Sequence, residues 1–294
     1  MTDQPLCLLT VHAHPDDEAS KGAGTVAKLH AEGVKSVLVC CTGGEEGDIL
    51  NPAMESDEVR ANLHEVRMQE LAESVRIIGY DELVMLGYRD SGMPDSEANA
   101  NPASFAMADL DEAVGRLVAA IREHKPQVIV TYDEDQSRYP HPDHLRVHDI
   151  SVLAFDAAGD PDRYPEAGPP WQPLKLYYSA WSVKRMYAMH QRMLELGLES
   201  PVDEERMKWI EEAMAAPDRI TTSVDIAEHA DVRQLALLAH RTQVDPNNRM
   251  WFGLPDDENR RIHPYDDYVL ARSLVDTTMP EDDLFAGVRS RVTR

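Results

Sequence analysis

The sequence predicts an α/β fold: a Rossmann-like, mostly parallel sheet flanked by helices, with an appended C-terminal α+β portion. Three observations indicate this class. Short apolar runs alternate with helical patterns through the first half of the chain, the helical patterns are long enough to serve as crossover connections, and the pattern changes after Asp160. We therefore expect a Rossmann-like core, residues 1–160, and a second portion, residues 161–294, that completes the sheet.

In the first half, strands and helices are expected to alternate as βαβ units. Four apolar runs predict strands: Leu6–Val11, Ser36–Thr42, Leu83–Leu86 and Gln127–Tyr132. Three segments with helical spacing of apolar residues predict helices: Lys21–Ala31, Glu55–Ile78 and Asp109–His124. Gly33 lies where a cap of the first helix is expected, and the polar loop Gly43–Met54 follows the second strand.

The second half begins with a segment, Asp160–Pro173, that holds five of the nineteen prolines and therefore predicts a loop. Two runs after it predict strands: Leu174–Ala180 and Ile220–Ile226. Four segments predict helices: Lys184–Leu196, Asp203–Ala216, Ala227–Arg241 and, near the end of the chain, Tyr265–Leu274.

Composition narrows the class of protein. Hydrophobic residues make up 43% and charged residues 28%, values typical of a globular chain. The net charge of −24 disfavours nucleic acids and anionic membrane surfaces as partners. Cys7, Cys40 and Cys41 are expected to be buried free thiols. Since no secretory leader is recognisable and no run reaches the ~18 apolar residues of a membrane span, we expect a cytoplasmic protein; its oligomeric state is left open.

Two motifs carry the chemistry. His12–Glu18 (HAHPDDE) follows the first strand and Tyr139–His144 (YPHPDH) follows the fourth. In a doubly wound sheet the first and fourth strands are commonly neighbours across the point where strand order reverses, and ligands bind in that crevice. Imidazole nitrogen and carboxylate oxygen are zinc ligands, and a catalytic zinc takes three protein ligands and leaves one position for water. The sequence therefore predicts a metal site between the two motifs.

Other metals fit the residues less well, with one exception. A cysteine-rich zinc site is excluded because no cysteine lies near either motif. Calcium would require more carboxylates and no histidine. Fe²⁺ accepts the same two-histidine, one-carboxylate set, so it stays possible beside zinc. Because Asp16 and Asp17 are adjacent, one can bind the metal while the other takes a proton from the attacking water.

The HPDDE and HPDH motifs resemble those of the PIG-L/LmbE-like family of zinc-dependent N-deacetylases and amidases. The resemblance implies a zinc-binding catalytic core in residues 1–160, with residues 161–294 covering the substrate pocket. It also implies roles for site residues. The implied zinc ligands, one zinc per chain, are His14, Asp17 and His144. The implied catalytic groups are Asp16 as general base, His141 as stabiliser or acid for the tetrahedral intermediate, and Tyr139 as an aid to the oxyanion. Asp143 is implied to lie behind a ligand, as a carboxylate that orients an imidazole.

Within that family, the similarity extends to actinobacterial amidases of mycothiol S-conjugates. It rests on four further segments: Gly43–Met54, Tyr132–His144, Lys175–Tyr178 and Met279–Gly287. The implied reaction is hydrolysis of the amide on glucosamine nitrogen of a small thiol–sugar conjugate, with Lys21, Arg67 and Asp90 as substrate-binding residues. Deacetylation of N-acetylglucosaminyl-inositol is the alternative. The loop Asp135–Arg138 departs from the family pattern, which keeps a third possibility open, a paralogue acting on a mycothiol-conjugated intermediate of natural-product biosynthesis.

Overall fold

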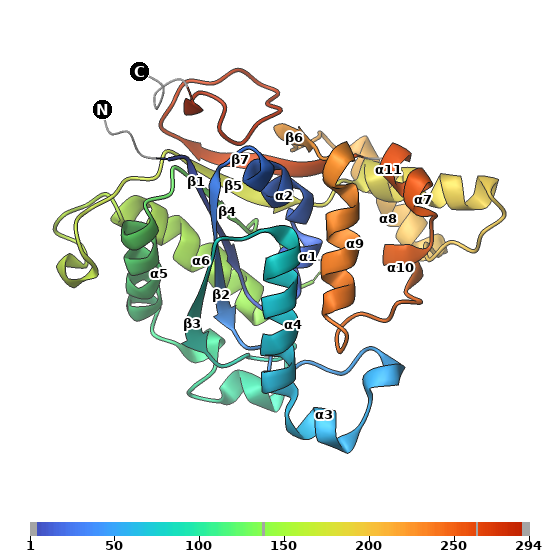
Figure 1. Cartoon of the computed structure of the whole chain (residues 1–294), viewed down its shortest axis with the longest axis horizontal. Helices are drawn as coiled ribbons and strands as arrows, with labels where there is room; N and C mark the ends of the chain where they lie inside the picture. Colours follow the sequence, from blue (N-terminus) through green and yellow to red (C-terminus); the bar gives the residue numbers. More distant parts are fainter. Residues whose placement is uncertain (1–4, 137–138, 263, 290–294) are drawn as a thin grey trace.

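A computed structural model describes residues 5–136, 139–262 and 264–289, and in this part of the chain the strands form a single sheet (Figure 1). Its order is β3-β2-β1-β4-β5-β7-β6. Strands β1 to β5 pair in parallel, while β7 runs antiparallel to both β5 and β6. The strands are β1 (Cys7–His12), β2 (Lys35–Thr42), β3 (Glu82–Tyr88), β4 (Val128–Thr131), β5 (Lys175–Ala180), β6 (Thr222–Asp225) and β7 (Tyr265–Ser273).

Helices cover both faces of this sheet. The α-helices are α1 (Asp17–Ser20), α2 (Ala23–Ala31), α3 (Asp57–Ala61), α4 (Leu63–Ile78), α5 (Leu110–His124), α6 (Pro142–Ala157), α7 (Val183–Glu195), α8 (Glu204–Ala215), α9 (Ala230–Ala239), α10 (Arg249–Phe252) and α11 (Asp256–Ile262). Short 3₁₀ turns lie between them at Pro52–Met54, Glu97–Ala100, Phe105–Met107, Pro165–Ala167 and Ala227–His229. In Figure 1, α7, α8, α10 and α11 gather beyond the β6–β7 end of the sheet.

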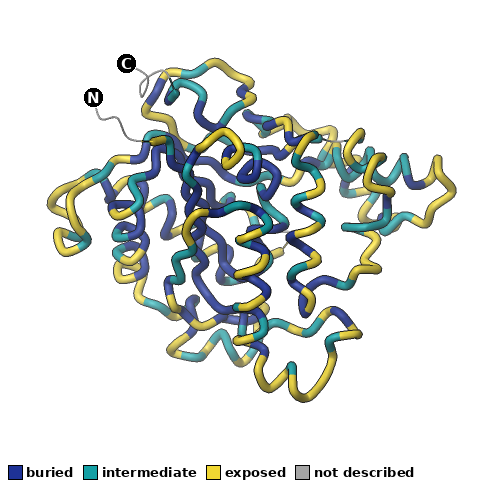
Figure 2. The backbone as a smooth tube through the Cα atoms, viewed as in Figure 1, coloured by how far each residue is buried: buried dark blue, intermediate teal, exposed yellow. Residues whose placement is uncertain are grey.

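The alternation of side chains along the central strands produces two apolar cores. On one face, Leu9 and Val11 of β1 pack with residues of α5 and α6 such as Leu117 and Ile150. On the other face, Leu8 packs with residues of α2, α4 and α9. In Figure 2 the backbone in the middle of the molecule is dark blue, which marks buried residues, and the yellow, exposed positions lie on the outer sides of the helices. Because its central strands are covered on both faces, the sheet holds their carboxyl ends rigidly.

The α/β fold class predicted from the sequence is confirmed, as are the buried cysteines, all three of which are free thiols. The prediction of a helix at Tyr265–Leu274 is wrong. This segment is β7, which pairs along its length with β5 and over its first residues with β6. Its apolar residues do not alternate cleanly, because a strand enclosed between two partners and covered by other elements has no single solvent face to mark it.

Two helix predictions need smaller corrections. The predicted helix Glu55–Ile78 is divided at Asn62 into α3 and α4. The predicted helix Lys21–Ala31 begins only at Ala23, after Gly22. Gly22 has φ 93°, and a Cβ there would lie 2.8 Å from the hydroxyl of Tyr268, so both the backbone and the neighbour favour glycine. The sequence reading missed α6, which begins inside the second motif.

The sheet runs without interruption across residue 160, because β4 of the first part pairs with β5 of the second through four residue pairs. The division into 1–160 and 161–294 stays a prediction. Among the described residues, no helix is long and apolar enough to cross a membrane.

Candidate metal centre

The reversal of strand order brings the two motifs together. β1 pairs with both β2 and β4, and the strand order reverses between β1 and β4. The segments that follow these two strands therefore start next to each other, at the edge of the sheet where ligands bind in such folds. The first motif turns directly from β1 into α1, and the second precedes α6. The two motifs therefore lie at the neighbouring strand ends where the sequence predicted them.

The turn at Asp16 separates the two adjacent aspartates. Asp16 has φ 119°, a conformation that L-residues rarely adopt, and it caps α1, in which Asp17 is the first residue. Asp17 Oδ2 accepts the backbone N–H of His14 at 3.0 Å. The backbone N–H of Asp16 donates to Glu18 Oε2 at 2.9 Å. The two carboxylates consequently face different partners, Asp17 toward the histidines and Asp16 toward Arg67.

Three donor atoms of the two motifs converge on one point. Asp17 Oδ2 lies 3.5 Å from His14 Nδ1 and 3.5 Å from His144 Nε2. All three residues are buried, and the three atoms are close enough together to hold one metal ion. His144 Nε2 is buried without a hydrogen-bond partner among the described residues. An orphaned imidazole nitrogen facing a carboxylate fits a metal ligand, because a bound cation would satisfy it.

The charges around this group favour deprotonated ligands at two positions. Burial lowers the pKa of His144, which keeps the imidazole neutral as a metal ligand requires. Burial alone would raise the pKa of Asp17, but Lys21 and His144 beside it hold that pKa well below the usual range. Burial opposes the charged form of His14 as well, yet its hydrogen bonds with Asp143 and Asp17 raise its pKa well above the usual value while no cation is bound.

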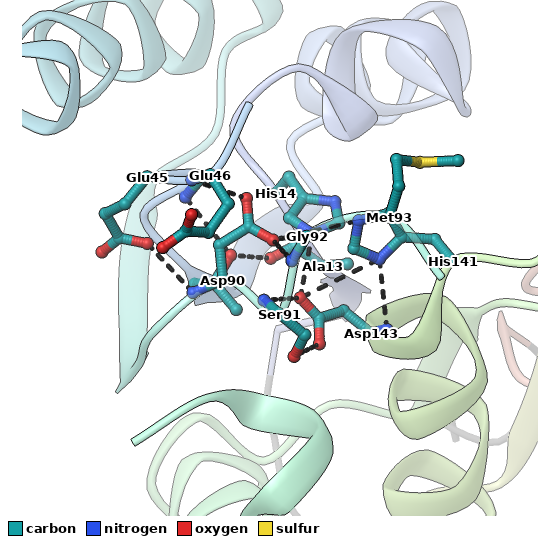
Figure 3. A network of polar contacts seen from close by, with 12 residues as sticks. Ala13, His14, Glu45, Glu46, Asp90, Ser91, Gly92, Met93, His141 and Asp143 are labelled. Carbon is teal, nitrogen blue, oxygen red and sulfur yellow. Dashed lines mark hydrogen bonds and ion pairs between the residues drawn. The ribbon is translucent and has the colours of Figure 1, made fainter. Parts of the chain in front are cut away.

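A second group of buried donors lies on the other side of the His14 ring (Figure 3). His14 Nε2 is 3.1 Å from Asp143 Oδ2 and 3.5 Å from Asp90 Oδ1. Together with His141 these atoms also lie close enough to hold a metal. Their hydrogen bonds are already filled, however. Asp143 accepts from the backbone N–H of Ser91 at 3.0 Å and from its hydroxyl.

Asp90, the other carboxylate of this second group, is filled in the same way, since it accepts from the backbone N–H groups of Gly92 at 2.8 Å and Glu46 at 3.3 Å. The orphaned atom belongs to the first group, His14–Asp17–His144. The first group is therefore the better candidate for the metal-binding site, and the second group is suited to orient the His14 ring.

His141 is the N-cap of α6, and this position defines its tautomer. Its Nδ1 accepts the backbone N–H of Asp143 at 3.2 Å. A nitrogen that accepts a hydrogen bond carries no proton, so in the neutral ring the proton is on Nε2. His141 Nε2 lies 3.9 Å from Asp90 Oδ1. Burial and the nearby His14 lower the pKa of His141 to about 4.

Tyr139 lies at the rim of the centre. Its side chain is 51% exposed, and its ring centroid is 5.2 Å from that of His144 and 5.9 Å from that of His141. The ring is nearly parallel to His141, at 25°. The unusual loop Asp135–Arg138 comes just before it, and residues 137 and 138 of this loop lie outside the described residues.

Two of the residues expected to bind substrate instead contact the aspartates. The ammonium of Lys21 forms an ion pair with Asp17 Oδ1 and lies 5.3 Å from the centroid of the Tyr132 ring. Arg67 is buried, donates to the carbonyl of Gly44 at 2.8 Å and lies 3.2 Å from Asp16 Oδ2. Both cations therefore neutralise and hold the acids of the first motif.

The sequence reading missed one residue of this centre, His240 at the end of α9. Its Nε2 lies 2.6 Å from Glu18 Oε1, and the Ser74 hydroxyl donates to the same oxygen at 2.5 Å. Glu18 and His240 are both fully buried. Because Glu18 also accepts the N–H of Asp16, the pair fixes the turn that separates the two aspartates. No local pattern marks His240, since its partner is 222 residues away.

Comparisons with known proteins agree with this geometry. The PIG-L family model, described as GlcNAc-PI de-N-acetylase, matches residues 9–155. A mycothiol S-conjugate amidase of Streptomyces coelicolor is 46% identical, with 98% of this chain and 99% of the relative covered. A 1D-myo-inositol 2-acetamido-2-deoxy-alpha-D-glucopyranoside deacetylase of Geodermatophilus obscurus is 38% identical, with 96% and 97% covered.

Among solved structures, N,N'-diacetylchitobiose deacetylase from Pyrococcus horikoshii superposes with a TM-score of 0.59 at 18% identity, covering 90% of this chain and 83% of that one. At this identity the likeness concerns the fold. The family match includes both motifs of the metal centre, and the two relatives cover nearly the full length. The chain belongs to the PIG-L family.

Proposed function

We propose that this chain is a zinc-dependent amidase that hydrolyses mycothiol S-conjugates to an N-acetylcysteine S-conjugate and glucosaminyl-inositol. The observation that carries the proposal is the convergence of His14, Asp17 and His144, with a further carboxylate, Asp16, and a neutral imidazole, His141, beside them. The identity of 46% to a mycothiol S-conjugate amidase supports the choice of substrate. The same identity supports a hydrolase acting on an amide bond.

In this proposal the zinc ligands are His14 Nδ1, Asp17 Oδ2 and His144 Nε2. Two imidazoles, one carboxylate and an open position are typical of catalytic zinc, and Fe²⁺ accepts the same set. A metal held there supplies an acidified water and polarises the amide carbonyl. Lys21 pairs with Asp17 Oδ1, which leaves Oδ2 for the metal.

Asp16 takes the proton of the attacking water. Its carboxylate is held by Arg67 Nη2 at 3.2 Å, and its side chain stays 30% exposed, so one oxygen remains accessible from the crevice. The fixed turn at Asp16 keeps this acceptor in place, which removes the entropic cost of orienting it during the reaction.

His141 stabilises the oxyanion with a hydrogen bond from its neutral ring, and the proton that Asp16 has taken from the water passes to the leaving glucosamine nitrogen. Its Nδ1 is occupied by the α6 backbone, so Nε2 is the atom that donates. Tyr139, stacked on His141 at the rim, adds a hydroxyl from the solvent side. Asp143, which lies 3.1 Å from His14 Nε2, holds that imidazole in the orientation that turns Nδ1 toward Asp17.

The sugar part of the substrate is assigned to the β3 side of the crevice. Asp90 follows β3, and Arg67 lies on the same side, where it donates to the carbonyl of Gly44 in the loop after β2. Lys21, the third residue of the proposed substrate-binding set, lies on the β5 side of the metal centre. Carboxylates at this side accept hydrogen bonds from hydroxyl groups, and Asp90 is anchored by the N–H of Gly92 at 2.8 Å. Lys21 has three N–H donors, of which Asp17 and Ser20 occupy two.

Side-by-side turnover tests the proposal. We expect the zinc-loaded protein to hydrolyse a mycothiol bimane conjugate with a higher kcat/KM than N-acetylglucosaminyl-inositol. The reverse preference would establish the deacetylase, the second candidate, which the 38% identity to deacetylases supports. High selectivity for one S-group would favour a biosynthetic paralogue, for which the departing loop Asp135–Arg138 provides a reason.

A further inference from the structure

A second pocket opens beside the metal centre, at the carboxyl end of β5. It is formed by the turn after α1, the end of β5 with the start of α7, one residue of α9, and the start of β7. Its lining residues are Ser20, Lys21, Gly22, Ser179, Ala180, Trp181, Ser182, Arg185, Arg233, Tyr265, Asp266, Asp267 and Tyr268. Lys21 belongs to both sites, because it lines this pocket and pairs with Asp17.

The order of strands puts this pocket opposite the sugar side. Asp90 follows β3, at one edge of the sheet, whereas Trp181 follows β5, and the metal centre lies at β1 and β4 between them. An amide whose carbonyl is at the metal and whose sugar points toward β3 must direct its acyl group toward β5. The pocket is therefore on the side of the acyl group and of whatever its sulfur carries.

One cation of this pocket, Arg185, has N–H donors that no described residue accepts from. Among the described residues, the structure gives the Arg185 guanidinium no hydrogen bond or ion pair. Its contact is with the ring of Trp181, 5.6 Å from the centroid. Burial lowers the pKa of Arg185 to about 10, so the side chain is still charged at neutral pH.

The carboxylates that line the pocket have other partners. Asp266 accepts from the backbone N–H of Thr25 at 2.9 Å and pairs with Arg233. Asp267 accepts from the Ser223 hydroxyl at 2.6 Å. Arg233 Nε is a further buried donor without a partner among the described residues. Asp266 and Asp267 act on Arg185 only through space, so its N–H donors remain available, and a guanidinium with available donors at a pocket wall is suited to the oxyanion of a ligand.

The mouth of the pocket is aromatic. Trp181 is 41% exposed, and its ring meets that of Trp251 on α10 edge to face, with centroids 5.3 Å apart and planes at 73°. An exposed indole beside a guanidinium provides a flat apolar surface with a positive end. A planar ring that carries an oxyanion matches that surface in both shape and charge.

We propose that this pocket takes the carboxylate at the far end of the substituent on the substrate sulfur, with the ring of the substituent on the exposed Trp181 at its mouth, and so selects conjugates whose substituent is an aromatic ring bearing a carboxylate. Arg185 pairs with the carboxylate and Trp181 stacks on the ring. The inference rests on the proposed function, since it concerns the acyl side of the same substrate. Arg185 and Trp181 are specificity residues, so neither contacts the amide that is cleaved.

Matched conjugates test it. Mycothiol carrying S-(4-carboxybenzyl), S-(4-carbamoylbenzyl) and S-benzyl groups differs only at the far end of the substituent. With the zinc-loaded protein we expect kcat/KM for the carboxylate to exceed that for the amide by about tenfold or more, the range of a hydrogen bond to a charged group. In Arg185→Gln this preference should disappear while S-benzyl turnover is kept, and Arg185→Lys should keep part of it.

The control is Lys184→Gln, which removes one positive charge from the same turn of α7. The Lys184 side chain is 63% exposed, pairs with Asp218 and does not line the pocket. Its preference should equal that of the wild type. Equal kcat/KM for the carboxylate and amide conjugates in the wild type would overturn the proposal, as would an equal loss of preference in Lys184→Gln.

A binding measurement separates this proposal from the proposed function. N-acetyl-S-(4-carboxybenzyl)cysteinamide and its carbamoyl analogue lack the sugar, and their affinities can be measured by calorimetry whether or not any conjugate is hydrolysed. Tighter binding of the carboxylate that is lost in Arg185→Gln supports the pocket even if the enzyme proves to be a deacetylase. Equal binding of the two compounds rejects the pocket even if the amidase activity is established.

Discussion

Replacing Asp16 by asparagine separates the chemistry of the centre from its architecture. The amide has the size of the carboxylate, and its oxygen can still accept from Arg67 Nη2, which lies 3.2 Å from the native Oδ2. The backbone N–H that bonds Glu18 is unchanged. None of the proposed metal donors, on His14, Asp17 and His144, is altered. We therefore expect Asp16→Asn to fold, to bind one metal per chain and to keep KM close to the wild-type value.

The rate should change far more than the binding. An amide does not accept a proton under these conditions, and a positioned general base contributes about 10²- to 10⁴-fold to turnover. At 1.36 kcal/mol for each factor of ten, that loss corresponds to about 2.7 to 5.4 kcal/mol of transition-state stabilisation. The affected term is kcat, because proton transfer to Asp16 takes place only as the water attacks.

The assay is amine release from a mycothiol conjugate by metal-reconstituted protein, with metal content measured on the same samples. Asp48→Asn is a matched control, because it removes one negative charge from an exposed residue of the nearby loop Gly43–Met54. It should leave kcat unchanged. A decrease in kcat of less than about tenfold in Asp16→Asn, with full metal content, would show that another group is the base.

Three further predictions concern other residues of the centre. His144→Ala should lose the metal. Chelation should then lower the Tm of the wild type, by the equivalent of about 2.7 kcal/mol if free metal had been a hundredfold above Kd, and should leave the Tm of the variant unchanged. One retained metal per chain in the variant would show that His144 is not a ligand. His141→Ala should lower kcat with little change in KM, and an effect on KM alone would reassign His141 to substrate binding. His240→Gln should lower the free energy of unfolding by about 1–3 kcal/mol, the value of a charged hydrogen bond, with the largest difference between about pH 4.5 and 6.5. Burial opposes the charged form of both residues. Glu18 nevertheless raises the pKa of His240, so the stability that charged His240 contributes is lost as the pH rises through the folded-state pKa of His240. His240 lowers the pKa of Glu18, so the stability that charged Glu18 contributes is lost as the pH falls through the folded-state pKa of Glu18. Chemical unfolding of both proteins from pH 4 to 9 measures this, and a difference that stays constant with pH would contradict the ion pair.

What the sequence predicted well is what short-range pattern encodes. Apolar runs gave the parallel strands to within about two residues, because a strand buried on both faces is apolar throughout. The rule that ligands bind where strand order reverses predicts that the two motifs lie together, as they do in the structure. The identity of the donors followed from residue chemistry, although their assignment as ligands stays a prediction.

What the sequence did not predict depends on contacts between distant segments. β7 was mistaken for a helix because its strand character comes from pairing with β5 and β6. No pattern in α4 predicts that the guanidinium of Arg67 contacts the carbonyl of Gly44 and Asp16, whereas its role in sugar binding stays a prediction. The helix α6 is not among the predicted elements, because its N-cap, His141, belongs to the motif that predicts the metal site.

The second half of the chain supports the first motif through buried polar contacts. His240 reaches Glu18 behind the first motif at 2.6 Å. Two residues further on, Thr242 donates its N–H to Glu70 of α4 at 2.9 Å, and its carbonyl accepts from Leu50 in the loop after β2 at 2.8 Å.

These contacts join the end of α9 to the first motif, to α4 and to the loop after β2. A buried carboxylate such as Glu18 or Glu70 would destabilise the fold if it lost its partner. The turn at Asp16, with φ 119°, needs such support because its conformation is unfavourable in isolation. The motif that carries the proposed ligands is therefore local in sequence, whereas the conformation that would allow it to hold a metal depends on residues more than two hundred positions away.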